Sequence, residues 1–141
     1  MASVFTKIID GELPGRFVWK DDRAVAFLSI NPITTGHTLV VPRQEVDHFL
    51  DLDDDLWLHL SQVTKHVGDA IQRAFDPPRV GTMIAGFEVP HCHVHVLQIA
   101  DLGDLSFDNA ATDPDPDEMD RAAEQIRAAL RDLGHDEVAG D

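Results

Sequence analysis

The chain has 141 residues, a length that suits a single domain with a buried core, and hydrophobic residues make up 43 % of it, as in ordinary globular proteins. Its formal net charge of −15 disfavours nucleic acid and anionic membrane surfaces as partners. No apolar run is long enough to cross a membrane, no signal peptide is visible and the single cysteine excludes an internal disulfide, so we expect a cytoplasmic protein.

The first part of the chain predicts a short helical turn followed by three strands. The turn covers residues 4–9, and the strands cover residues 17–20, 24–28 and 38–41. The polar residues Asp21, Asp22 and Arg23 predict a hairpin turn between the first two strands. Asn31-Pro32 then breaks the chain, and Pro42 ends the third strand.

Apolar residues at helical spacing from Leu52 to Phe75 predict one long helix, which Asp51 or Asp53 can cap. Two strands follow, near residues 79–84 and over residues 91–99, and we expect both to be central in the sheet. This order of elements, with short connections, indicates a mostly antiparallel sheet covered by helices, which is an α+β fold.

A loop from residue 101 to residue 113 leads to a C-terminal helix. Asp115 is its expected N-cap, Pro116 its first residue, and Gly134 its end. Residues 1–134 are therefore expected to form a single domain. For residues 135–141 we expect a disordered C-terminal tail.

Three histidines, His91, His93 and His95, alternate with small or β-branched apolar residues in the stretch 91–99. Because side chains of an extended strand alternate between its two faces, the three imidazoles should share one face. Val94, Val96 and other strand-favouring residues support an extended conformation over a helix.

The residues alone leave three explanations for this alignment open. The imidazoles bind a metal, act as nucleophile and general acid on an electrophile such as phosphorus, or are incidental surface histidines. The run from Gly81 to Pro90 favours chemistry on phosphate, because its glycines let the backbone approach a ligand and its free N–H groups could hold phosphate oxygens.

The pattern His91-x-His93-x-His95, with Ala85-Gly86 before it, resembles the signature of the histidine-triad (HIT) nucleotide-binding family. Residues 36–43, Gly-His-Thr-Leu-Val-Val-Pro-Arg, and the opening around residues 5–14 are similar to two further motifs of that family. The resemblance covers about residues 4–99. It implies a HIT-like fold with a five-stranded antiparallel sheet, one long helix and a C-terminal helix, usually assembled as a homodimer.

The resemblance also implies a mechanism on a purine nucleotide or nucleotide conjugate. His93 would attack the α-phosphorus and form a covalent nucleotidyl-histidine, which water then cleaves. His95 would contact the scissile phosphate and help to protonate the leaving group. His91 would orient His93, partly through its backbone carbonyl, and His37 would add a fourth histidine to the site.

Residues that bind the nucleotide carry over from the family by position. Those that would enclose the base are Val4, Phe5, Ile8, Phe27 and Ile30, which could equally be core residues. Ser29 stands at the ribose position. Gly86 and the backbone after it, at Phe87 and Glu88, would cradle the phosphate.

Three positions depart from the family pattern. Ser29 replaces an Asp that grips the ribose hydroxyls, Val80 replaces an Asn, and Phe87 replaces a Gln. One hydroxyl cannot replace a bidentate acceptor, and two polar contacts to phosphate or leaving group are lost. The expected pocket is more apolar than is usual for the family, and its substrate need not be a standard adenosine nucleotide.

Some bacterial relatives bind a structural zinc through two N-terminal cysteines, a loop histidine and the first triad histidine. Ser3 and Thr6 occupy the cysteine positions here and are poor zinc ligands. We therefore expect no metal site and no required cofactor.

Two functions from different classes remain. The first is an enzyme, a hydrolase of phosphoramidase type or a nucleotidyl transferase, that cleaves a nucleoside phosphoanhydride or phosphoramidate at the α-phosphorus. The alternative is a non-catalytic nucleotide-binding or sensing module. A metal hydrolase built on the three histidines is a third hypothesis. The intact triad favours the nucleotide hydrolase or transferase.

Overall fold

The computed structural model describes residues 2–139 and contains one five-stranded sheet with three α-helices. The strands are β1 (Phe17–Lys20), β2 (Ala24–Leu28), β3 (Thr38–Pro42), β4 (Arg79–Met83) and β5 (Val94–Ile99), and the helices are α1 (Val4–Ile9), α2 (Asp54–Phe75) and α3 (Pro116–Asp132). Three short 3-10 helices lie in the loops: η1 (Phe49–Asp51), η2 (Leu102–Leu105) and η3 (Phe107–Asn109).

The strand order in the sheet is β1-β2-β3-β5-β4, and every neighbouring pair is antiparallel. The α+β prediction, with one long helix and a C-terminal helix, is confirmed. The expectation that β4 is central is wrong, because within residues 2–139 it pairs only with β5 and lies at the edge. Half-exposed residues along β4 are consistent with this edge position.

Helix α2 begins and ends where its capping residues predict. The side chain of Asp53 accepts a hydrogen bond from the backbone N–H of Leu56, which caps the first turn. At the other end Asp76 adopts a left-handed conformation (φ 48°) and closes the helix. Within residues 2–139 no helix is both long and apolar enough to span a membrane.

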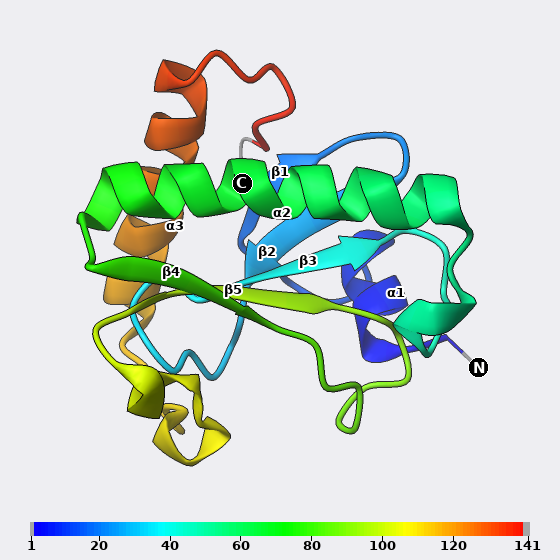
Figure 1. Ribbon diagram of the computed structural model, residues 1–141, viewed down its shortest axis with the longest axis horizontal. Coiled ribbons are helices and arrows are strands. Elements are labelled where there is room, and N and C mark those ends of the chain that lie inside the picture. The colour runs from blue at the N-terminus through cyan, green and yellow to red at the C-terminus, as the bar shows by residue number, and fades with distance from the viewer. Residues whose placement is uncertain (1, 140–141) are drawn as a thin grey trace.

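The two faces of the sheet carry different amounts of structure (Figure 1). Helices α2 and α3 cover one face and form the larger core with apolar residues such as Leu60, Ile71 and Ile126. The opposite face carries the short helix α1 over a smaller cluster that includes Phe5 and Phe27. The α1 face is therefore only partly covered, which leaves room for a cavity.

The strand that contains the histidine stretch is shorter than the expected range of residues 91–99. Strand β5 begins at Val94, so His91 and His93 precede it. The alternation is nevertheless kept, because Cys92, Val94 and other residues of that parity pack in the larger core.

The C-terminal tail is ordered as far as residue 139, contrary to the expected disorder. The backbone N–H of Lys20 donates to the carbonyl of Glu137, and that of Ala139 donates to Val18. Trp19 pairs with Val138 in an antiparallel bridge, and its ring packs against that of His135. The tail thus covers the free edge of β1, a long-range pairing that local sequence patterns do not reveal; residues 140 and 141 lie outside the described range.

Two glycines give opposite predictions for stability. Gly36, directly before His37, has φ +85°, and a Cβ added there would lie 2.5 Å from Cε2 of Phe75. We expect Gly36→Ala to lower the free energy of unfolding by about 1–3 kcal/mol. Gly68 in α2 is the matched control, because an added Cβ would make an ordinary 3.6 Å contact with Val80, and Gly68→Ala should stabilise the fold by about 0.4–1 kcal/mol. Urea unfolding measures both changes, and equal effects at the two positions would contradict this account.

Candidate functional site

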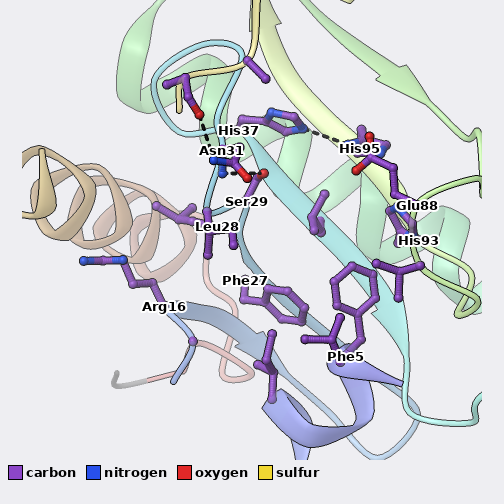
Figure 2. A pocket seen from close by; sticks show the side chains of 18 of the residues that line it. Phe5, Arg16, Phe27, Leu28, Ser29, Asn31, His37, Glu88, His93 and His95 are labelled. Atoms are coloured by element: carbon purple, nitrogen blue, oxygen red, sulfur yellow. Dashed lines mark hydrogen bonds between the residues drawn. The ribbon is translucent and has the colours of Figure 1, made fainter. Parts of the chain in front are cut away.

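A cavity of about 910 Å³ opens on the α1 face of the sheet, a size typical of sites for small molecules (Figure 2). It brings together most of the residues proposed from the sequence. Those that line it are Val4, Phe5, Ile8, Phe27, Ser29, Ile30, His37, Glu88, His93 and His95.

Strand register explains why these residues meet. Phe27 on β2 pairs with Leu39 on β3, and Leu39 pairs with His95 on β5. Directly paired residues of an antiparallel sheet point to the same face. The side chains of Phe27, Leu39 and His95 therefore form one row on the floor of the cavity. Beyond this row, the backbone N–H of Ser29 donates to the carbonyl of His37 (2.9 Å), which places these two residues side by side.

The ring of His93 is held in one tautomer. Its Nδ1 lies 2.8 Å from the carbonyl oxygen of His91. Because a carbonyl can only accept, Nδ1 carries the proton, and Nε2 of the neutral ring has a free lone pair. The ring packs edge-on against Phe5, with centroids 4.9 Å apart.

The ring of His95 is held in the opposite tautomer to that of His93 by a series of hydrogen bonds through His37. The backbone N–H of Ile33 donates to His37 Nδ1 (3.0 Å), so His37 carries its proton on Nε2. That Nε2–H donates to His95 Nδ1 (2.9 Å), as Figure 2 shows. His95 is left with an N–H on Nε2, a donor beside the free lone pair of His93.

Burial keeps the imidazoles of His37 and His95 neutral. It lowers the pKa of His37 to about 4, with a smaller contribution from the positive charge of His93. It lowers the pKa of His95 to about 3, and charges on His37 and His93 add to the shift. His95 is thus a neutral hydrogen-bond donor at pH 7 in the free protein, and its pinned Nδ1 opposes protonation.

His91 lines neither the cavity nor the hollow beside it, so its imidazole does not face the site with the other two. Its Nε2–H donates to the carbonyl of Pro42 (2.7 Å), and its Nδ1 accepts from the hydroxyl of Ser3 (2.7 Å). Both ring nitrogens are therefore engaged in a fully buried position. What His91 presents to the site is its backbone carbonyl.

Ser3 and Thr6, expected from the sequence to be poor zinc ligands, form a hydrogen-bond network with Glu45. Thr6 Oγ1 donates to Oε1 of Glu45 (2.7 Å), and the backbone N–H of Ser3 donates to the same oxygen (2.7 Å). Among residues 2–139 no group of three or more His, Cys, Asp or Glu side chains is arranged to hold a metal ion.

A second hollow of about 80 Å³ adjoins the cavity at the histidines. It is lined by Ala85, Gly86, Phe87, Glu88, His93, His95 and Phe107. Gly86 has φ +86°, a left-handed conformation that suits glycine and turns the chain here. The predicted phosphate cradle is therefore placed beside the histidines rather than in the large cavity.

One wall of the cavity comes from a loop that no sequence pattern singled out. Phe107, Asp108 and Ala111 come from the loop 101–113, whose sequence has no periodic pattern. The loop is held over the site because the side-chain N–H of Asn31 donates to the carbonyl of Ala111 (2.9 Å). Arg16 and Asp120 line the cavity as well, and no sequence signal singled them out.

The buried histidines predict a decline in stability at acid pH. An unfolded histidine binds its proton near pH 6.5, whereas folded His37 and His95 bind theirs only near pH 4 and 3. Below pH 6.5 the unfolded state therefore binds more protons, and stability should fall as the pH drops from about 6.5 through 4. NMR titration of the imidazole nitrogens checks the cause directly, and a pKa above 6 for His95 would contradict the hydrogen-bond chain.

A family model for the HIT domain matches residues 10–101 of the chain. An uncharacterized HIT-like protein of Borreliella burgdorferi is 40% identical over 101 residues, which cover 67% of this chain and 73% of that protein. The protein hit of Bacillus subtilis is 29% identical over 135 residues, which cover 90% and 93%.

Solved structures agree with this match. A zinc-bound histidine triad family protein from Mycobacterium smegmatis superposes with a TM-score of 0.80 at 27% identity, over 94% of this chain and 96% of that one. A hypothetical histidine triad nucleotide-binding protein from Sulfolobus tokodaii gives 0.80 at 28% identity, over 92% of each chain. The sequence motifs, the fold and these matches agree, and the chain belongs to the histidine-triad (HIT) family.

Proposed function

We propose that the protein is a nucleotide hydrolase or nucleotidyl transferase that cleaves a nucleoside phosphoanhydride or phosphoramidate at the α-phosphorus through a covalent intermediate on His93. The observation that carries this proposal is the 2.8 Å bond from His93 Nδ1 to the carbonyl of His91. It leaves the Nε2 lone pair free at the point where the cavity and the small hollow meet, which is the requirement for a nucleophile.

The large cavity supplies a place for the nucleoside. Phe5 and Phe27 face each other edge to face, with ring centroids 5.5 Å apart, and with Ile8 they give an apolar slot for a base. The Sulfolobus tokodaii relative is described as nucleotide-binding, which supports the same class of ligand here. Phe5 also packs on His93, so a base held there would bring its 5′-phosphate close to the nucleophile.

Bond formation and bond cleavage would both occur at the α-phosphorus. The Nε2 lone pair of His93 forms a bond to phosphorus while the bond to the leaving group breaks, and the electron pair departs with that group. The proton stays on Nδ1 and remains hydrogen-bonded to the carbonyl of His91, which stabilises the positive charge that develops on the ring. Water then attacks the nucleotidyl-histidine and releases the nucleotide, and its proton passes to solvent.

His95 acts in this proposal mainly as a hydrogen-bond donor. Its Nε2–H would hold a non-bridging phosphate oxygen, and backbone N–H groups after Gly86 would hold another. The hydrogen-bond chain from Ile33 through His37 makes His95 a poor acid, so we assign protonation of the leaving group to solvent rather than to this ring.

We extend the proposal to metal independence, assembly and location. No metal is required, because both ring nitrogens of His91 and of His37 are engaged and Nε2 of His95 carries a proton, which leaves His93 as the one of these four rings with a free lone pair. A homodimer is supported by the edge strand β4, which pairs on one side only within residues 2–139. Cytoplasmic location fits the single cysteine, Cys92, which is buried and free.

The alternative is a module that binds nucleotides without efficient turnover. Ser29 favours it, because its hydroxyl already accepts a weak bond from the N–H of Asn31 (3.3 Å) and offers a ribose less than a carboxylate would. Turnover separates the two functions.

Release of AMP from an adenosine 5′-phosphoramidate, measured with a chelator present, tests the proposal. Wild type should release AMP, and His93→Ala should reduce kcat on the order of a thousandfold or more because the nucleophile is lost. AMP binding should change little. His48, an exposed histidine that lines neither hollow, provides the control His48→Ala, which should retain full activity.

Retained turnover in His93→Ala would overturn the assignment of the nucleophile. Loss of activity with chelator in the wild type would favour the metal hydrolase. If the wild type binds AMP but releases none from any substrate, the binding module is the correct function.

A further inference from the structure

The peptide group that joins His91 to Cys92 is held from both of its sides. Its carbonyl oxygen accepts the 2.8 Å hydrogen bond from His93 Nδ1. Its N–H donates to the carbonyl of Val46 at 2.7 Å. Because a peptide group is planar, fixing the N–H also fixes the direction of the carbonyl. The segment that follows β3 therefore supports the proposed nucleophile through Val46.

Glu45, directly before Val46, ties the same segment to the start of α1. Its Oε1 accepts from the backbone N–H of Ser3 and from the hydroxyl of Thr6, each at 2.7 Å. These two bonds, that from Ser3 first, lower the pKa of the Glu45 carboxyl, so that it is ionised at neutral pH. Figure 1 shows the start of α1 beside the segment that follows β3. One exposed carboxylate thus joins two segments that are about 40 residues apart in sequence.

The carboxylate of Glu45 also determines which hydroxyl donates to His91. The hydroxyl oxygens of Ser3 and Thr6 lie 2.7 and 3.4 Å from His91 Nδ1. Each hydroxyl has one hydrogen to donate, and the carboxylate, as the stronger acceptor, takes that of Thr6. Ser3 is left to donate to His91 over the shorter distance. The His91 ring is then fixed at Nδ1 by Ser3 and at Nε2 by Pro42.

We propose that Ser3 and Glu45 are positioning residues for the proposed nucleotidyl transfer, an inference that rests on that function. Ser3 holds the His91 ring, and Glu45 holds Ser3 against the segment that contains Val46. Together they keep the His91 carbonyl directed at His93 Nδ1. Both residues lie outside the linings of the cavity and the hollow, so they act through His91 and not on the substrate. A His93 ring with its proton on Nε2 has no lone pair there for phosphorus, so loss of alignment lowers the rate.

Kinetics of two variants test this inference with adenosine 5′-phosphoramidate as the substrate. Ser3→Gly removes the hydroxyl but keeps a residue type that suits a helix N-cap, so it costs the helix little. Glu45→Ala removes the shared acceptor, whereas Glu45→Gln keeps an amide oxygen in its place. We expect Ser3→Gly and Glu45→Ala to lower kcat on the order of tenfold, with KM changed by less than about twofold, because alignment and not binding is lost. Glu45→Gln should retain most of the activity.

The tautomer of His93 is a readout that a merely structural role would not change. ¹⁵N NMR of the imidazole nitrogens, recorded near pH 8.5, where histidine is ordinarily neutral, should show the proton on Nδ1 in the wild type. Ser3→Gly and Glu45→Ala should show a mixture of both tautomers. Asp53→Ala is the matched control, because it removes the N-cap of α2, away from the cavity and the hollow. It should leave kcat and the His93 tautomer unchanged.

Several outcomes would overturn the inference while the proposed function stands. They are a wild-type kcat in Ser3→Gly or Glu45→Ala, a lower kcat with an unchanged His93 tautomer, equal losses in Glu45→Gln and Glu45→Ala, or an equal loss in Asp53→Ala. Failure of the wild type to release AMP would instead reject the proposed function. The NMR comparison would then still decide whether Ser3 and Glu45 position His93.

Discussion

The site depends on one hydrogen bond, from His93 Nδ1 to the backbone carbonyl of His91. A backbone carbonyl is a fixed acceptor that cannot change its protonation, so it selects one tautomer of His93 more firmly than a titratable side chain would. The carbonyl is itself held in place because the His91 ring is bound at both nitrogens, by Pro42 and Ser3. The N-terminal helix, strand β3 and the histidine segment are thereby joined at a single buried residue.

His37 and His95 complete the site by placing a hydrogen-bond donor beside His93. His37 and His95 share a chain of hydrogen bonds that begins at a backbone N–H, and burial holds both rings neutral. The result is a lone pair on His93 next to an N–H donor on His95. A bound phosphate would therefore meet a nucleophile and a donor that are already oriented, which reduces the reorganisation needed for reaction.

Local patterns in the sequence were sufficient for most of the fold. Alternation and turn residues located β1 to β3, and helical periodicity with Asp53 and Asp115 as caps located α2 and α3. Features that depend on contacts distant in sequence could not be predicted. They include the edge position of β4 and the pairing of residues 137–139 with β1.

The same distinction applies to the site. Motif spacing identified the histidines, and the resemblance to the HIT family supplied the residues that we propose enclose the base. The different environments of His91 and His95 depend on partners 88 and 58 residues away, Ser3 and His37, so spacing alone placed all three imidazoles on one face. The wall from the loop 101–113 has no periodicity, and only its packing over the cavity reveals Phe107.

The central claim is that reaction at phosphorus proceeds through a covalent bond to His93. It is tested most directly by the stereochemistry of hydrolysis of an adenosine 5′-phosphoramidothioate of known configuration at phosphorus, carried out in ¹⁸O-labelled water. Attack by His93 followed by attack of water gives two displacements, so the account predicts net retention of configuration. Net inversion would show a single displacement by water and would contradict the covalent mechanism.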